Sequence, residues 1–197
     1  MTRIAIIVGS TRPGRRADAV ARWVHDVAAL RDDATFELVD LADFDLPLLD
    51  EPQPAAFGPH YEHAHTRAWS AAIASFDGYV FVTPEYNHST SGALKNAIDF
   101  LYTEWNDKAA GFVGYGLQGG ARAVEHLRLI ASELKIADVR AQVALSVFTD
   151  FEGVRVTPGV HQAASLETML DELVAWSDAL RVVRAPAVAE LSRAASA

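Results

Sequence analysis

Residues 4–16 read IAIIVGSTRPGRR, and this stretch decides which kind of fold to expect. The run from Ile4 to Val8 is apolar throughout and rich in β-branched residues, which is typical of a strand buried on both faces of a parallel sheet. Gly9 ends that run, and from Arg16 to Leu30 apolar residues recur at helical spacing. A buried strand that leads through a short loop into a helix predicts the first β–α unit of an α/β protein.

The rest of the chain repeats this alternation. The predicted strands cover residues 4–8, 36–41, 79–82, 111–115 and 139–147. The predicted helices cover residues 16–30, a segment around Ala68, 93–102, 121–134 and 166–183. Five strands separated by helices predict a parallel sheet with right-handed crossovers. No linker or internal repeat interrupts the pattern, so we expect one domain over residues 1–184 and a frayed tail over 185–197.

The composition excludes several classes of function. The chain has 197 residues with 26 acidic and 17 basic side chains, and its net charge of −9 disfavours binding to nucleic acid or to anionic membranes. It has no cysteine, which excludes disulfides, cysteine-ligated metal centres and a thiol nucleophile. No apolar run reaches the length of a membrane span or of a signal-peptide core, so we expect a cytoplasmic protein.

The loop after the first strand, residues 9–16, has the chemistry of an anion site. A helix N-terminus offers free N–H groups and a positive dipole end, while Ser10 and Thr11 add hydroxyls and three arginines add charge. A Walker A loop is excluded because its lysine is missing, and Thr11 occupies the second glycine position of the dinucleotide fingerprint. The loop therefore predicts a site for a terminal phosphate monoester, as on FMN. The alternative is an ordinary turn with solvated arginines.

The loops after the third and fourth strands complete the predicted site. Residues 83–92 read TPEYNHSTSG, where backbone N–H groups near Glu85 can line the edge of a flat heterocycle and Tyr86 can border it. Ser89 or Ser91 can cap the following helix. Residues 114–120, GYGLQGG, are dense in glycine, so their backbone can approach a ligand closely. The alternatives are a packing aromatic for Tyr86, a solvated carboxylate for Glu85 and a flexible glycine turn.

Taken together, these loops resemble the NADPH-dependent FMN reductase family, whose members include FMN, quinone, chromate and azo-dye reductases. The resemblance rests on GSTRPGR at residues 9–15, PEYNHS at 84–89, LKNAID at 94–99 and GG-x-R at 119–122. It extends from residue 4 to about residue 183. It implies a flavodoxin-like three-layer sandwich whose five-stranded parallel sheet has the order 2-1-3-4-5.

The resemblance also implies which residues bind FMN. In the family the first loop holds the phosphate, the Pro-Glu-Tyr-Asn segment borders the isoalloxazine ring, and the glycine loop closes the ring's other edge. The residues so implied are Ser10, Arg12 and Arg15, then Pro84, Glu85, Tyr86 and Asn87, then Gly116, Gly119 and Gly120. Two positions depart from the family pattern: Arg15 stands where many members have serine, and Ser91 stands where proline usually precedes Gly92.

The implied activity is an FMN-dependent NAD(P)H oxidoreductase. NADPH or NADH would give a hydride to flavin N5, and the electrons would pass to a small-molecule acceptor such as free flavin, a quinone, an azo dye or a metal oxyanion. The cofactor carries this chemistry, so no catalytic side chain is expected. An electron carrier of flavodoxin type and a non-catalytic flavin-binding module remain as alternatives. The resemblance further implies a homodimer or a tetramer.

Two weaker features allow more than one interpretation. His60, His63 and His65 have metal-ligand chemistry, but we expect no metal there and favour a lid or a subunit interface. The aromatic stretch from Phe100 to Trp105 fits either an oligomer contact or the core.

Overall fold

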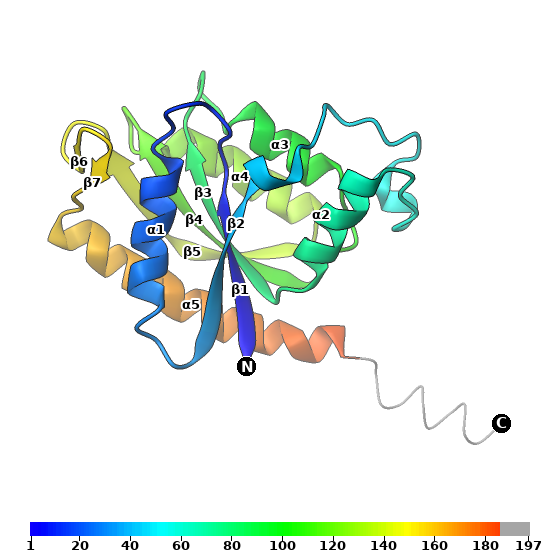
Figure 1. Ribbon diagram of the computed structural model, residues 1–197. Helices are drawn as coiled ribbons and strands as arrows, with labels where there is room; N and C mark the ends of the chain where they lie inside the picture. Colours follow the sequence, from blue (N-terminus) through cyan, green and yellow to red (C-terminus); the bar gives the residue numbers. More distant parts are fainter. Residues whose placement is uncertain (186–197) are drawn as a thin grey trace.

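The computed structural model describes residues 1–185, and its centre is a sheet of five parallel strands in the order β2-β1-β3-β4-β5 (Figure 1). The strands are β1 (Thr2–Val8), β2 (Ala34–Asp40), β3 (Gly78–Pro84), β4 (Lys108–Gly116) and β5 (Ile136–Ser146). This arrangement confirms the predicted fold class and strand order. The predicted tail lies, from residue 186 onward, outside the described residues, and the single-domain boundary stays a prediction.

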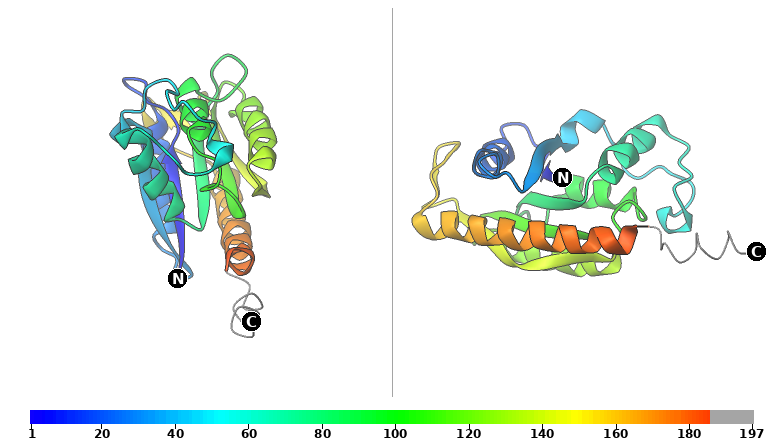
Figure 2. Two further views of the ribbon diagram at one scale, coloured as in Figure 1. Left: turned by 90° about the vertical axis from the view of Figure 1, so that its right-hand side faces the viewer. Right: turned by 90° about the horizontal axis from the view of Figure 1, so that it is seen from below.

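Helices cover both faces of the sheet and create two cores (Figure 2). Helices α1 (Ala17–Ala28) and α5 (Val160–Arg184) pack on one face. Helices α2 (Ala64–Ala74), α3 (Gly92–Asp99) and α4 (Ala121–Glu133) pack on the other. Within residues 1–185, none of the helices has the length and apolar character needed to cross a membrane.

The aromatic stretch that follows α3 belongs to the second core. Phe100 and Trp105 are fully buried, and the ring of Trp105 meets those of Trp69 and Tyr79 edge to face at 6.1 and 5.0 Å between centroids. The core interpretation is therefore confirmed for these two rings, whereas the partly exposed Tyr102 lines a surface hollow, so an oligomer contact by this stretch stays a prediction.

Several boundaries differ from the sequence prediction. Helix α5 begins at Val160, whereas the sequence predicted a start at Leu166. The prediction missed the first turn because it is exposed (Val160 by 90%) and carries no apolar periodicity. Strand β2 ends at Asp40, one residue before the predicted end, and two short 3₁₀ helices that the sequence did not predict, η1 (Leu41–Phe44) and η2 (Ala55–Phe57), lie between it and α2. An antiparallel hairpin of β6 (Phe151–Glu152) and β7 (Arg155–Val156) follows β5, and strands of two residues leave no period in the sequence.

The sheet fixes where the first loop leaves it. Gly9 follows β1 directly and donates its N–H to the carbonyl of Val82 in the neighbouring strand β3 at 2.8 Å. A Cβ at this position would lie 2.4 Å from that carbonyl oxygen, so only glycine allows the approach. Because β1, β3 and β4 are parallel neighbours in the sheet, the loops that follow them start side by side at the carboxyl ends of the strands.

Candidate functional site

A cleft of about 520 Å³ lies where these loops meet. It holds six of the ten residues predicted to bind the cofactor. Those six are Arg12, Arg15, Pro84, Glu85, Tyr86 and Gly116. The other four, Ser10, Asn87, Gly119 and Gly120, stand next to these residues in the same three loops but do not line the cleft wall.

Ser10 lies beneath the first loop and connects it to the loop after β3. Its side chain is buried, and its Oγ lies 3.1 Å from the hydroxyl oxygen of Tyr86. The backbone N–H of Arg12 also points at this Oγ, at 3.4 Å. One side-chain pair thus joins the predicted phosphate loop directly to the predicted ring loop.

Arg15 is committed to contacts within the protein. Its Nε lies 2.8 Å from the carboxylate of Asp18, its Nη2 donates to Asp40, and its Nη1 donates to the carbonyl of Ser10 at 2.5 Å. Burial alone would lower the pKa of Arg15, but the hydrogen bond to Asp40 and the charges of both carboxylates raise it above its ordinary value. The side chain braces the loop, and its charge is offset by two carboxylates.

The segment after β3 folds into a tight turn with Tyr86 and Ser89 at its ends. Their backbones exchange hydrogen bonds, at 2.9 Å from Tyr86 N–H and 3.1 Å from Ser89 N–H. Asn87 and His88 between them have φ values of 48° and 73°, as a type I′ turn requires. Asn87 therefore stands exposed at the tip of the turn, while Tyr86 faces the cleft.

Glu85 connects this loop to the start of α4. One carboxylate oxygen accepts the backbone N–H of Arg122 at 3.0 Å, and the other lies 2.7 Å from the Arg122 guanidinium. The interpretation of Glu85 as a solvated loop carboxylate is wrong, because only 8% of its side chain is exposed. Glu85 caps a helix that has no capping side chain of its own.

The glycine loop after β4 packs closely under the cleft. Gly119 and Gly120 are buried and have φ values of 66° and 74°. A Cβ on Gly120 would lie 2.5 Å from the backbone nitrogen of Tyr115, so a side chain here would displace the strand. Gly116 reaches the cleft itself, beside Glu85.

Six further residues line the cleft that the sequence did not assign to the site. They are Gly14, Arg16, Tyr115, Leu117, Val147 and Val154. Arg16 directly follows the predicted phosphate residues, and Tyr115 and Leu117 lie inside the glycine loop. The sequence motifs could therefore have included these three residues in the site. Val147 follows β5 and reaches the cleft by donating its N–H to the carbonyl of Gly116 at 3.1 Å, and Val154 reaches it because the β6–β7 hairpin folds over it. Burial, with a smaller effect of Tyr86, raises the pKa of the Tyr115 hydroxyl above its ordinary value.

The donor set of the cleft suits a phosphate monoester. Helix α1 begins without a capping side chain, so its first N–H groups are available to an anion. Arg12 and Arg16 stand beside that helix end. Among residues 1–185, Glu85 is the one carboxylate that lines the cleft, and Arg122 already neutralises it. The residues present therefore fit the phosphate of FMN.

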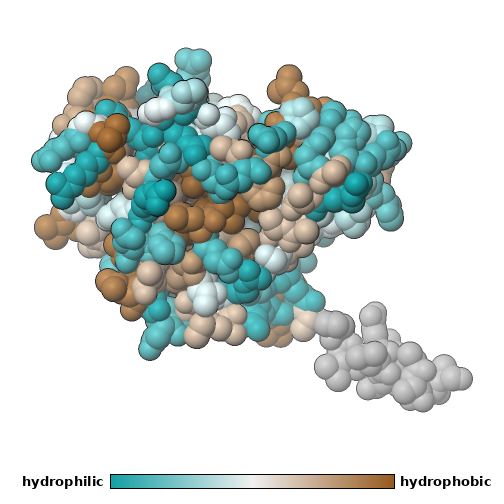
Figure 3. Space-filling view, viewed as in Figure 1, coloured by the Kyte–Doolittle hydropathy of each residue, from teal (hydrophilic) through white to brown (hydrophobic). Residues whose placement is uncertain are grey.

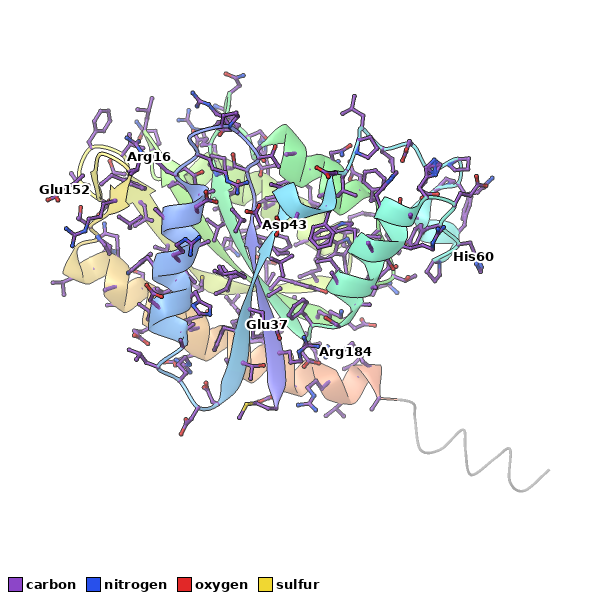
Figure 4. The ribbon with its side chains drawn as sticks, in the orientation of Figure 1. Arg16, Glu37, Asp43, His60, Glu152 and Arg184 are labelled. Atoms are coloured by element: carbon purple, nitrogen blue, oxygen red, sulfur yellow. The ribbon has the colours of Figure 1, made fainter. Side chains whose placement is uncertain are left out.

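The histidine cluster lies elsewhere. His60 stands at the opposite side of the molecule from Arg16 (Figure 4). His63 and His65 approach the carboxylate of Asp50 at 3.5 and 3.0 Å. Among the residues the structure describes, no three histidine, aspartate or glutamate side chains gather as metal ligands.

Comparison with known proteins identifies the relatives of this chain. The model of the family described as NADPH-dependent FMN reductase matches residues 2–150. An NAD(P)H-dependent FMN reductase of Nectria sp is 43% identical over 159 residues, which cover 76% of this chain and 79% of that protein. A 2-hydroxy-1,4-benzoquinone reductase of Burkholderia sp is 31% identical over 185 residues, covering 88% and 95%.

A solved structure shares the fold. The flavoenzyme NAD(P)H:acceptor oxidoreductase of Paracoccus denitrificans superposes with a TM-score of 0.70 at 23% identity, covering 90% of this chain and 98% of that one. At this level of identity the likeness concerns the architecture alone.

Proposed function

Because this chain belongs to the NADPH-dependent FMN reductase family, and is therefore an oxidoreductase that uses FMN and NAD(P)H, we propose that it binds FMN in the cleft above β1, β3 and β4 and reduces a small acceptor there. The observation that carries this proposal is the composition of the cleft. The arginine-bearing loop after β1 lines one part of it, the loop with Tyr86 lines another, and the Ser10–Tyr86 contact connects the two loops.

Bound FMN would supply the redox chemistry, taking a hydride from NAD(P)H at N5 and passing two electrons to the acceptor. The protein's part is to bind and orient. The N–H groups of Glu85 and Tyr86 donate to the carbonyls of Tyr115 and Ser89, so we expect backbone amides of the loop after β4 to stabilise negative charge at the ring edge. No side-chain nucleophile is needed.

One side of the cleft is apolar and is lined by Leu117, Val147 and Val154. This side favours a flat, apolar acceptor of the quinone class, and Leu117 and Val154 are exposed by 65% and 68%. In the space-filling view, apolar brown side chains reach the surface at the upper left, where Figure 1 places the hairpin (Figure 3). Exposed apolar side chains beside a polar cleft are typical of a binding surface.

The first experiment is a visible spectrum of the purified protein with added FMN, followed by NADPH or NADH without oxygen. We expect FMN to remain with the protein through gel filtration and its visible absorbance to bleach at once on addition of either nucleotide. Free FMN mixed with the same nucleotide is the control for uncatalysed reduction.

The other outcomes separate the remaining functions. Bound flavin that neither nucleotide bleaches contradicts the reductase proposal and favours an electron carrier or a non-catalytic flavin-binding module. No bound flavin would remove the assignment of the cleft altogether. If the flavin is reduced, turnover with benzoquinone, an azo dye and chromate then ranks the acceptors.

A further inference from the structure

We propose that Arg16, and not Arg15, joins Arg12 in providing the positive charge for the flavin phosphate, and that the same side chain holds the β6–β7 hairpin over that end of the cleft. This inference rests on the proposed function, because it concerns how this chain would bind FMN. It alters the residue assignment that the family resemblance implied for the first loop.

Arg15 is poorly suited to bind a phosphate. All three of its guanidinium nitrogens have protein acceptors, namely the carboxylates of Asp18 and Asp40 and the carbonyl of Ser10. Two carboxylates beside one guanidinium leave no net positive charge at that point. An incoming phosphate would have to displace these acceptors and would meet the negative charge of the two carboxylates.

Arg12 and Arg16 have the opposite surroundings. Both line the cleft beside the uncapped start of α1, and within residues 1–185 neither lies within 4.0 Å of a carboxylate. Arg16 uses one nitrogen, Nε, to donate to the carbonyl of Gly153 at 3.1 Å. Its two terminal nitrogens have no acceptor in the described part of the chain, and a guanidinium that presents two parallel N–H groups suits a phosphate.

The same side chain contacts the hairpin in two ways. Besides the hydrogen bond to Gly153, its guanidinium carbon lies 5.1 Å from the centroid of the Phe151 ring, which is a cation–π distance. The Phe151 ring in turn lies 6.2 Å from that of Tyr115 in the cleft wall. Arg16 stands at the side of α1 that faces the hairpin, which also bears Glu152 (Figure 4).

The hairpin is fixed at its base and depends on Arg16 at its tip. The buried Asp150 accepts the N–H of Ser146 at 2.8 Å with its carboxylate and the N–H of Thr157 at 2.9 Å with its carbonyl. The tip residue Gly153 has a φ of 63° and open space around its Cα. Engaging Arg16 with a phosphate while its Nε keeps the Gly153 contact would therefore hold the tip against the cleft.

The test compares the binding of FMN and riboflavin, which differ only in the phosphate, by quenching of flavin fluorescence in the cofactor-free protein. In Arg16→Gln we expect FMN binding to weaken roughly 10-fold or more, the range for a lost charge-assisted hydrogen bond, with riboflavin changing less than about threefold. Arg22→Gln, on the exposed side of the same helix, is the matched control and leaves both affinities unchanged.

Arg15→Gln distinguishes bracing from phosphate binding. Removing the brace disorders the whole loop, so we expect the affinities for FMN and riboflavin to fall together while their ratio is kept. A ratio that collapses in Arg15→Gln and survives in Arg16→Gln would overturn the proposal.

Limited trypsin cleavage after the exposed Arg155 reports on the hairpin without any turnover. We expect FMN, but not riboflavin, to slow this cleavage in the wild-type protein, and to lose that effect in Arg16→Gln. Arg16→Lys keeps the charge without the guanidinium geometry, so it should retain part of the preference for FMN and lose the protection. Equal protection by FMN in wild type and Arg16→Gln contradicts the hairpin role.

The failure of this inference is distinguishable from the failure of the proposed function. If the wild-type protein binds neither flavin, both fall together. Suppose instead that the wild-type protein binds FMN and that Arg16→Gln melts at the same temperature. If this variant then prefers FMN over riboflavin as strongly as wild type does, only the inference about Arg16 falls.

Discussion

The pair Ser10–Tyr86 is the smallest unit of the site. The two oxygens lie 3.1 Å apart, although 76 positions separate the residues in the sequence. Ser10 is buried and Tyr86 is half-buried, so water competes only partly for this contact. The position of the tyrosine ring beside the cleft therefore depends on one hydroxyl contact and on the tight turn that follows it.

Replacing Tyr86 with phenylalanine keeps the ring and removes the contact. A lost neutral hydrogen bond costs about 0.5–1.5 kcal/mol, so we expect FMN affinity to fall about 2- to 10-fold in Tyr86→Phe, and further in Tyr86→Ala, which also loses the ring. Fluorescence titration measures the affinity, and urea unfolding of the cofactor-free protein checks that the fold remains. Tyr102→Phe loses a hydroxyl far from the cleft and serves as the control. Unchanged FMN affinity in Tyr86→Ala would exclude this tyrosine from the site.

At the scale of an element, the C-terminal end of α2 contacts a buried lysine that lies at the start of β4. Lys108 Nζ donates to the carbonyls of Ile73 and Ala74 at 3.0 and 3.2 Å and to the Tyr79 hydroxyl at 2.9 Å. A cation at a helix C-terminus satisfies carbonyls that have no partner within the helix. Burial, with the nearby charge of Arg184, nevertheless lowers the pKa of Lys108 to about 8.

This lowered pKa predicts how stability depends on pH. Between pH 8 and 9.5 the unfolded chain keeps the Lys108 proton, because its ordinary pKa is 10.5, while the folded chain releases it. The unfolded state then binds more protons, so stability rises with pH by roughly 1–2 kcal/mol over this range. Urea unfolding at several pH values measures the rise, and Lys108→Met should remove it. An equal rise in both proteins would show that another group causes it.

At the scale of the whole molecule, an apolar surface lies between α3, α4 and the segment before η2. Two hollows form it, and they share Lys95 and Ile130. Leu129, exposed by 74%, lines one hollow, and Leu49 lines the other. Apolar hollows joined in this way are typical of subunit interfaces, and they support the homodimer or tetramer that stays a prediction for this chain.

A charge placed on this surface tests that prediction. We expect the wild-type protein to sediment as a dimer or larger, and Leu129→Asp to shift it to the monomer, because a carboxylate buried at an apolar interface has no partner. Leu30→Asp, at a position 88% exposed at the end of α1, should leave the mass unchanged. A monomeric wild-type protein would contradict the prediction directly.

The sequence by itself determined the main strands and helices, whose patterns depend on near neighbours along the chain. Apolar runs and helical periods located five strands and five helices, because burial of a strand or a helix face repeats within a few residues. The glycines and arginines of residues 9–16 and the motif at 84–89 pointed to two of the loops that line the candidate cleft. Ser91 was one of two serines expected to cap α3, and it does so by accepting the N–H of Leu94 at 3.1 Å, since a cap spans only three residues.

Only the tertiary structure decided which polar groups find partners far away in the sequence. Arg15 and Arg16 are adjacent in the chain, yet the first meets Asp40 across the end of β2 and the second meets Gly153 in the hairpin. Glu85 is a loop carboxylate by sequence, but packing brings it to Arg122. No local pattern encodes such pairs, because the charge available to a ligand depends on which carboxylates the fold brings beside each arginine.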